Sequence, residues 1–233
     1  MINYELKKIL DKKFQIFGGR IGSGKTEIAV NIAIALKLQD VGNTLFDMDI
    51  VKPYVRIRDI KEKISAYELT IISPPDITRT LDLPIFPPYI IGRLMENETV
   101  KILDVGGDPY GAGSIAQFRN VIETGGYNFF FVVNTKRPET STEDEIISSF
   151  REVEHASRLK VTHFILNTNL RWETTRRVFE EGKAILEKVS AKTGIPVEFG
   201  CVEKNHEEIA ENAALPILPL ELFIKPLPDL SNK

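Results

Sequence analysis

Cysteine, histidine and long apolar runs are scarce in this chain of 233 residues. Its single cysteine, Cys201, cannot form a disulfide or hold an iron–sulfur cluster within one chain, so we expect a small buried apolar side chain there. The three histidines do not cluster at the spacing of metal ligands. No stretch reaches the roughly 20 apolar residues of a membrane-spanning helix, and the charged N-terminus lacks the apolar core of a signal peptide. We therefore expect a cytoplasmic protein without an integral membrane segment.

An excess of positive charge is also absent. The formal net charge is −3 and the sequence pI is about 5.8. This is not the basic footprint of a nucleic-acid binder, so we expect no nucleic-acid partner. Hydrophobic residues make up 42% of the chain, enough for a packed core. The length suits one domain over residues 1–233.

Short apolar runs alternate with longer helical patterns along most of the chain. Each apolar run ends in polar residues or glycine, which is typical of buried strands. The predicted strands span 14–19, 43–49, 101–107, 127–134, 161–167 and 197–202. The predicted helices span 26–39, 114–124, 141–158, 173–193 and 204–214. Such alternation predicts an α/β fold with a mostly parallel sheet and helices on both faces.

Two proline-rich regions depart from this pattern. Residues 50–100 mix helical and loop character, as functional segments over a sheet edge often do. The tail after residue 214 carries too many prolines for a long amphipathic helix. We expect it to be extended chain packed on the body of the protein.

A phosphate-binding motif follows the first predicted strand. The stretch GRIGSGKT fits the pattern G-x-x-x-x-G-K-[ST], with a strand before it and a helix after it. Its glycines turn successive backbone N–H groups inward, and the helix adds its positive N-terminal end. Lys25 is expected to reach the β- and γ-phosphates, and the Thr26 hydroxyl to ligate Mg²⁺. The predicted nucleotide-binding residues of this loop are Gly19, Arg20, Ile21, Gly22, Ser23, Gly24, Lys25, Thr26 and Glu27.

The motif resembles the P-loop of the MinD/ParA-type ATPases, which are related to the nitrogenase iron protein. That group carries an extra lysine at the second position of the motif and glycine at the third, where this chain has Arg20 and Ile21. In the resembling dimers the lysine crosses to the nucleotide of the partner subunit. Arginine keeps the charge and offers a bidentate fork to phosphate, so the resemblance implies a phosphate role for Arg20, in trans or in cis. The alternative is an arginine that is solvated or paired with a carboxylate.

Two further segments are similar to the switch regions of this group. The stretch FDMDIVKP resembles the first switch, which implies that Asp49 positions the attacking water or the Mg²⁺ shell. The stretch DVGGD resembles the second switch. Asp104 ends an apolar strand, as a carboxylate that holds Mg²⁺ through water should. Asp108 is a second candidate for orienting water, and the glycines of this loop would let it reshape around a γ-phosphate.

Asn167 ends the predicted strand 161–167. In the resembling proteins an asparagine near this place recognises adenine, since an amide both donates and accepts hydrogen bonds. GTPases use an Asn-Lys-x-Asp signature, which the stretch 134–137 does not match. The resemblance therefore implies ATP and ADP with Mg²⁺ as ligands.

The resemblance implies an ATPase that dimerises when it binds ATP and signals to a protein partner that the sequence does not identify. No iron–sulfur cluster is expected, because the relatives that share one use two cysteines from each subunit. Two alternatives remain open. One is an ATP-dependent small-molecule kinase or ligase of the dethiobiotin-synthetase type, with residues 70–100 as a lid over its substrate. The other is a nucleotide-binding scaffold that barely hydrolyses ATP.

Overall fold

A parallel β-sheet organises the computed structural model, which describes residues 8, 10–49, 57–74, 86–211 and 213–224. The described residues form eight strands in the order β3-β2-β4-β1-β5-β6-β7-β8, and each neighbouring pair is parallel. The strands are β1 (Phe14–Gly18), β2 (Asn43–Asp47), β3 (Thr70–Ile72), β4 (Val100–Asp104), β5 (Tyr127–Val133), β6 (His163–Leu166), β7 (Val197–Glu203) and β8 (Ile217–Leu220). The predicted α/β class with a mostly parallel sheet is confirmed.

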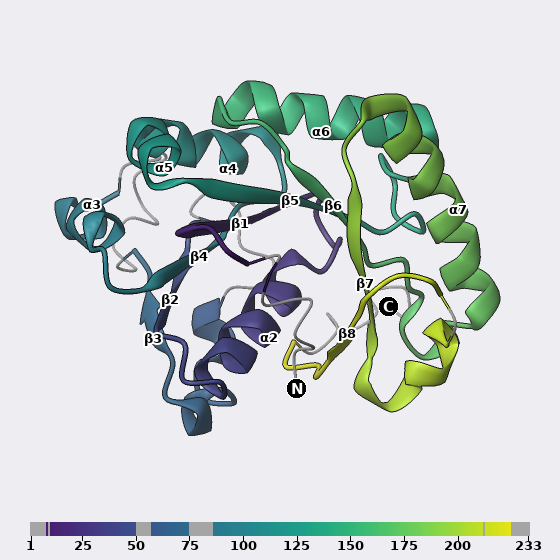
Figure 1. Cartoon of the computed structure of the whole chain (residues 1–233), viewed down its shortest axis with the longest axis horizontal. Helices are drawn as coiled ribbons and strands as arrows, with labels where there is room; N and C mark the ends of the chain where they lie inside the picture. The colour runs from purple at the N-terminus through teal and green to yellow at the C-terminus, as the bar shows by residue number, and fades with distance from the viewer. Residues whose placement is uncertain (1–7, 9, 50–56, 75–85, 212, 225–233) are drawn as a thin grey trace, which may run out of the picture.

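Helices cover both faces of the sheet (Figure 1). The α-helices are α2 (Lys25–Lys37), α3 (Pro88–Met95), α4 (Pro109–Gly113), α5 (Arg119–Gly125), α6 (Glu143–Ser157) and α7 (Arg176–Thr193). The 3-10 helices are η1 (Ile57–Ile60), η2 (Ser65–Tyr67), η4 (Ser114–Phe118), η5 (Arg171–Glu173) and η6 (Lys204–Ala210). One core cluster lies under α3 to α7, and a second lies between the sheet, α2 and η1. None of the helices described is long and apolar enough to cross a membrane.

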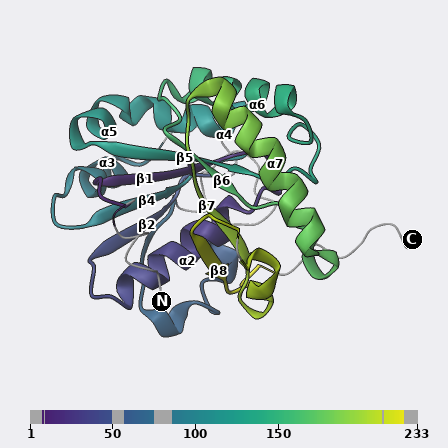
Figure 2. The same cartoon turned by 45° about the vertical axis from the view of Figure 1, so that its right-hand side comes forward.

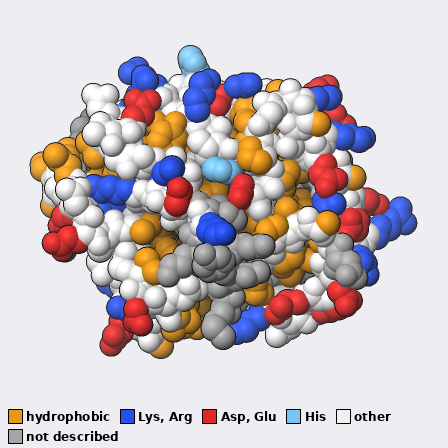
Figure 3. Space-filling model, viewed as in Figure 1, with side chains coloured by type: hydrophobic (Ala, Val, Ile, Leu, Met, Phe, Trp, Pro, Cys, Tyr) orange, Lys and Arg blue, Asp and Glu red, His pale blue; other side chains and the backbone are white. Residues whose placement is uncertain are grey.

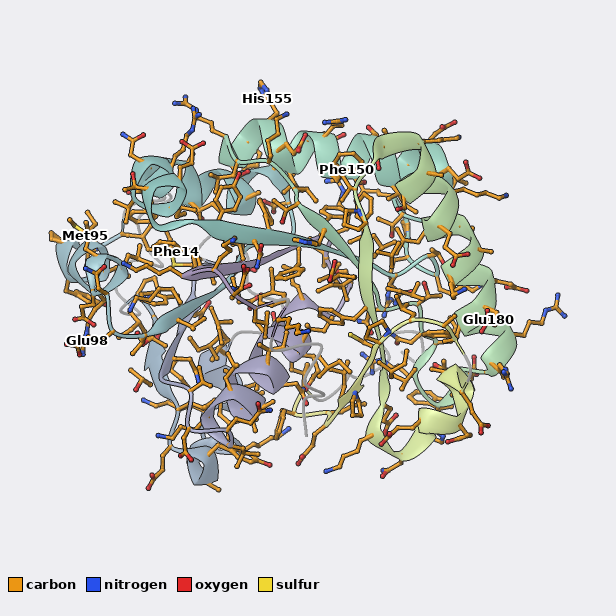
Figure 4. The ribbon with its side chains drawn as sticks, viewed as in Figure 1. Phe14, Met95, Glu98, Phe150, His155 and Glu180 are labelled. Carbon is orange, nitrogen blue, oxygen red and sulfur yellow. The ribbon has the colours of Figure 1, made fainter. Side chains whose placement is uncertain are left out.

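The central strands alternate large side chains between these two clusters. In β5, Phe129 and Phe131 belong to the first cluster and Phe130 to the second, because successive side chains of a strand point to opposite faces. Phe131 meets Phe150 of α6 edge to face, with ring centroids 6.2 Å apart. Figure 4 shows Phe150 directed from α6 toward the sheet, while His155 on the same helix points outward. These aromatic contacts seat α6 over the middle of the sheet.

Local signals fix the ends of the longest helices. Thr142 precedes α6, and its hydroxyl accepts a hydrogen bond from the backbone N–H of Glu145 at 3.3 Å. The Glu145 carboxylate accepts one from the backbone N–H of Thr142 at 3.1 Å, which completes a capping box. Helix α7 ends at Gly194, whose φ of 74° suits glycine. All three signals can be read from the sequence.

Some predicted elements differ in the structure. The helix expected over 114–124 is instead the 3-10 helix η4 followed by α5, with α4 directly before them. The helix expected over 204–214 is the 3-10 helix η6, which is interrupted at His206 because its φ of −133° is not helical. The strand β3 was not predicted. Of the proposed lid and loop region, residues 50–56 and 75–85 lie outside the described residues.

The proline-rich tail contains the edge strand β8. It pairs in parallel with β7, with Pro219 opposite Val202. An edge strand tolerates proline because one side of its backbone needs no partner. Figures 1 and 2 both show β8 close to α2, and the predicted packing of the tail on the body is therefore seen up to Ile224. On the face drawn in Figure 3, acidic and basic side chains are interspersed.

Candidate functional site

The predicted phosphate-binding loop connects β1 to α2 at the carboxyl end of the sheet. Its last glycine, Gly24, has φ +92°, and a Cβ atom there would lie 2.1 Å from Nδ2 of Asn167. Asn167 follows β6, and its amide Nδ2 donates to the carbonyl oxygen of Ser23 at 2.6 Å. Glycine is therefore required at this position, both for its backbone angle and for the close approach of the amide. The loop shape is held from a neighbouring strand.

Lys25, Thr26 and Asp104 meet at the start of α2. Asp104 is the last residue of β4 and is in register with Phe17 of β1 and Asp47 of β2. The Thr26 hydroxyl Oγ1 donates to Oδ2 of Asp104 at 2.7 Å. Parallel strands thus deliver a buried carboxylate to the first turn of the helix that follows the phosphate-binding loop.

The second predicted switch lies directly against this loop. A Cβ atom at Gly107 would lie 2.9 Å from the ammonium Nζ of Lys25 and 2.9 Å from the backbone nitrogen of Ile21. A side chain at position 107 would therefore collide with both groups. The same loop carries Gly106, whose Cβ position is 3.1 Å from Oδ1 of Asp49. Asp49, Asp104 and Lys25 consequently border one small region.

The charge balance of this region is unusual. The pKa of Asp104 is raised to about 7, chiefly by burial and to a smaller extent by the charges of Asp47 and Asp49. The charge of Lys25 and the hydrogen bond from Thr26 act in the opposite direction. Three carboxylates therefore lie near one ammonium group. A bound cation would favour the charged form of Asp104.

The residues present fit Mg²⁺ and phosphate. Oδ1 of Asp104 and Oγ of Ser23 are buried and have no hydrogen-bond partner among the described residues. Thr26 and Asp104 would hold the cation, with Asp49 close to its shell. No group of three or more His, Cys, Asp or Glu side chains suited to a metal is found in the described part of the chain. Mg²⁺ beside phosphates needs no such group, since it keeps several waters and uses one or two carboxylates.

Arg20 is turned toward helix α6. Its Nε donates to Oγ of Ser149 at 2.9 Å, and its Nη2 donates to Oε2 of Glu152 at 2.5 Å. Oε2 of Glu139 lies 3.6 Å from the same Nε. The side chain is only 9% exposed. Arg20 is thus paired with carboxylates in this structure, and contact of Arg20 with a nucleotide stays a prediction.

The other predicted residues occupy different positions around the loop. Ile21 is 48% exposed at the loop surface. The carboxylate of Asp108 caps α4 by accepting the backbone N–H of Gly111 at 2.7 Å. The buried carboxylate of Glu27 accepts the backbone N–H groups of Phe223 at 2.6 Å and Ile224 at 3.2 Å. Glu27 therefore joins α2 to the C-terminal segment through its side chain.

Sequence reasoning missed two neighbours of the site. Asp47 is the last residue of β2 and lies in the same Asp-x-Asp stretch as Asp49, which was the signal that would have found it. Arg137 follows β5 and lies against the phosphate-binding loop at Gly22. No motif marks Arg137. Cys201 is buried as predicted, and burial raises the pKa of its thiol well above the usual value.

The comparisons with solved structures concern the fold. The cell division protein FtsY of Thermotoga maritima matches with a TM-score of 0.56 and 19% identity, over 84% of this chain and 69% of that one. FlhF complexed with GTP and Mg²⁺ matches with a TM-score of 0.52 and 16% identity, over 81% of this chain and 65% of that one. The fold is that of P-loop NTPases. No family model and no curated protein matches the sequence.

A third solved structure is similar to this chain to about the same extent. The signal recognition particle receptor FtsY of Elizabethkingia anophelis, in complex with GDP, matches with a TM-score of 0.55 and 13% identity, over 82% of this chain. The chain spans 58% of that protein and 65% of FlhF, less than two thirds of each. At such identities the likeness concerns the fold. These proteins are not MinD- or ParA-type ATPases, so that finer resemblance stays a prediction.

Proposed function

We propose that this P-loop NTPase binds ATP with Mg²⁺, hydrolyses it slowly, and works as a dimerising nucleotide switch for a protein partner. The observation that supports the proposal best is the contact of Thr26 with Asp104 beside Lys25. It combines an ammonium group for phosphate with a hydroxyl and a carboxylate for the cation. Bound Mg²⁺ would neutralise the negative charge of the phosphate oxygens.

We assign roles in nucleotide hydrolysis to four side chains. Lys25 holds the β- and γ-phosphates and stabilises the charge of the leaving group. Asp49 and Asp108 are the candidates for orienting the attacking water. Arg20 would contact phosphate only after it leaves Glu152 and Glu139. We therefore propose a step that releases Arg20 from these carboxylates, together with a protein partner.

The switch itself would be the loop between β4 and α4. A Cβ atom at Gly107 would lie 2.9 Å from the backbone nitrogen of Ile21, and one at Gly106 would lie 2.6 Å from Cα of Gly111 in α4. A γ-phosphate held by Lys25 would occupy space at this contact, whereas the diphosphate would not reach it. The triphosphate and diphosphate states would therefore place α4 differently. Such a difference in contacts is what a ligand needs to shift a conformational equilibrium.

Adenine is proposed as the base. The residues that follow β6, from Asn167 to Leu170, offer amides and a hydroxyl but no carboxylate. Guanine presents two N–H donors on one edge and favours a carboxylate there, while adenine needs one acceptor and one donor. In this structure the Nδ2 of Asn167 already donates to Ser23. Because FlhF and FtsY were crystallised with GTP and GDP, guanine nucleotides are the necessary competitors in any test.

Light scattering tests the switch directly. The molar mass is measured with Mg-ADP, with a non-hydrolysable ATP analogue and with the matching GTP analogue, for the wild type, Lys25→Ala and Arg20→Ala. We expect a dimer only with the ATP analogue and only in the wild type. A monomer in every state, from a protein that binds the nucleotide, would contradict the switch. A burst of ADP that depends on an added small-molecule acceptor would then favour the kinase or ligase alternative.

A further inference from the structure

We propose that Arg137 is a nucleotide-binding residue that holds the diphosphate part of the nucleotide from the β5 side of the P-loop. The inference rests on the proposed function, since it requires that a nucleotide occupies the loop. Neither the loop motif nor the switch segments include this residue. Its assignment comes from its position, from the rigidity of the segment that carries it, and from its charge.

Position is the first argument. A Cβ atom at Gly22 would lie 3.3 Å from Nε, 3.6 Å from Cζ and 3.7 Å from Cδ of Arg137. The guanidinium group therefore rests on the phosphate-binding loop. Arg137 is half-buried there, although it lies more than a hundred residues away from the loop in the sequence. A cation in this place adds to the field of the loop's N–H groups.

The segment that carries Arg137 is tied to its neighbours. The backbone N–H of Arg137 donates to the carbonyl of Asn134 at 3.1 Å. The Asn134 side chain donates to the carbonyl of Asn169 at 3.2 Å, in the segment after β6. The hydroxyls of Thr135 and Thr168 lie 3.2 Å apart and hydrogen-bond to each other. Because these bonds join the ends of β5 and β6, the Arg137 backbone is placed before any ligand arrives.

Charge is the third argument. Among the described residues, the Arg137 side chain makes no hydrogen bond and no ion pair. Its neighbours are paired: Lys136 contacts Glu181 at 3.0 Å, and Arg20 contacts Glu152. Half-burying a guanidinium group without a counter-charge costs free energy, because the group loses part of its hydration. A phosphate oxygen in the P-loop would supply the missing charge and accept its forked N–H groups.

The strand order assigns the part of the nucleotide that Arg137 meets. Lys25 and Asp104 lie toward β4, on one side of β1, where Gly107 borders the γ-phosphate position. Arg137 and Asn167 follow β5 and β6, on the other side. A nucleotide that points its last phosphate to Lys25 and its base toward Asn167 passes Arg137 with its first two phosphates. These are common to diphosphates and triphosphates.

Calorimetric titration tests the assignment. Mg-ADP and a non-hydrolysable Mg-ATP analogue are titrated into the wild type, Lys25→Ala, Arg137→Ala, Arg137→Lys and the control Lys136→Ala. A charge-assisted hydrogen bond of ordinary strength predicts that Arg137→Ala binds both nucleotides about tenfold to hundredfold more weakly. Arg137→Lys keeps the charge but loses the forked N–H donors, so its nucleotide affinity should lie between those of Arg137→Ala and the wild type. The nucleotide affinity of Lys136→Ala should stay within about twofold of the wild-type affinity, because its partner Glu181 lies outside the loop.

The possible failures are distinguishable. If the wild type binds, Lys25→Ala does not, and Arg137→Ala matches the wild type, then the Arg137 assignment is wrong and the proposed function stands. A loss confined to the triphosphate analogue would place Arg137 at the γ-phosphate and overturn the diphosphate assignment. Absence of nucleotide binding by the wild type would overturn both proposals. Thermal melts without ligand show whether each variant is folded at the temperature of the titration.

Discussion

Arg20 and its two carboxylate partners should contribute unequally to stability. The Arg20 side chain is 9% exposed, whereas Glu152 is 46% and Glu139 is 64% exposed. Replacing Arg20 with alanine returns both carboxylates to water, so the loss is limited to the charge-assisted hydrogen bonds, about 1.5–3 kcal/mol. Replacing both glutamates with glutamine leaves a buried guanidinium without a counter-charge, which costs about 3–5 kcal/mol. The double variant should therefore be the less stable one.

Thermal unfolding without nucleotide measures this difference. Each kcal/mol shifts the Tm of a chain of this size by about 2–4 °C. The Tm of Glu139→Gln/Glu152→Gln should consequently lie several degrees below that of Arg20→Ala. Glu181→Gln is the matched control, since its partners Lys136 and Arg177 are surface cations and the pair should matter little. A Tm of the double variant equal to or above that of Arg20→Ala would refute the reasoning from burial.

The other predictions concern three hydrogen-bonded side chains. Asn167→Ala leaves a P-loop carbonyl unpaired and should lower the free energy of unfolding by about 1–3 kcal/mol, measured by urea titration. Glu27→Ala frees the backbone N–H groups of Phe223 and Ile224, so their amide hydrogen exchange should become faster while that of the central strands stays unchanged. Unchanged exchange at both amides would mean that Glu27 does not hold the C-terminal segment. Thr142→Ala removes the capping box of α6 and should cost about 0.5–2 kcal/mol, with Thr142→Ser close to the wild type.

Contiguous patterns predicted much of the fold. The six predicted strands and the P-loop depend on neighbouring residues, such as the alternating phenylalanines of β5, and all six strands are present. The strand β3 was missed because three residues are too few to show a period. The strand β8 was missed because Pro219 argues against a strand until the edge position is known. The alternation of strands and helices still predicted the fold class correctly, although β3 and β8 were missed.

The site was predicted only where its residues belong to recognisable short motifs. Thr26 and Asp104 come from two such motifs, and the contact between their side chains is seen, while the roles of Lys25, Thr26 and Asp104 stay predictions. The partners of Arg20 were not predicted, because Glu152 lies far from it in the sequence and meets it only when α6 packs on the sheet. Arg137 reaches Gly22 in the same way, through the order of β1 and β5. Such contacts follow from topology, which short patterns do not encode.

Nucleotide binding at the P-loop is the central claim, and one titration tests it most directly. Mg-ADP, Mg-GDP and their triphosphate analogues are titrated into the wild type and into Lys25→Ala by calorimetry. The account predicts saturable binding of one adenine nucleotide per chain by the wild type, weaker binding of the guanine nucleotides, and no measurable binding by Lys25→Ala. Equal affinities in the two proteins, or no binding of any nucleotide by the wild type, would contradict it.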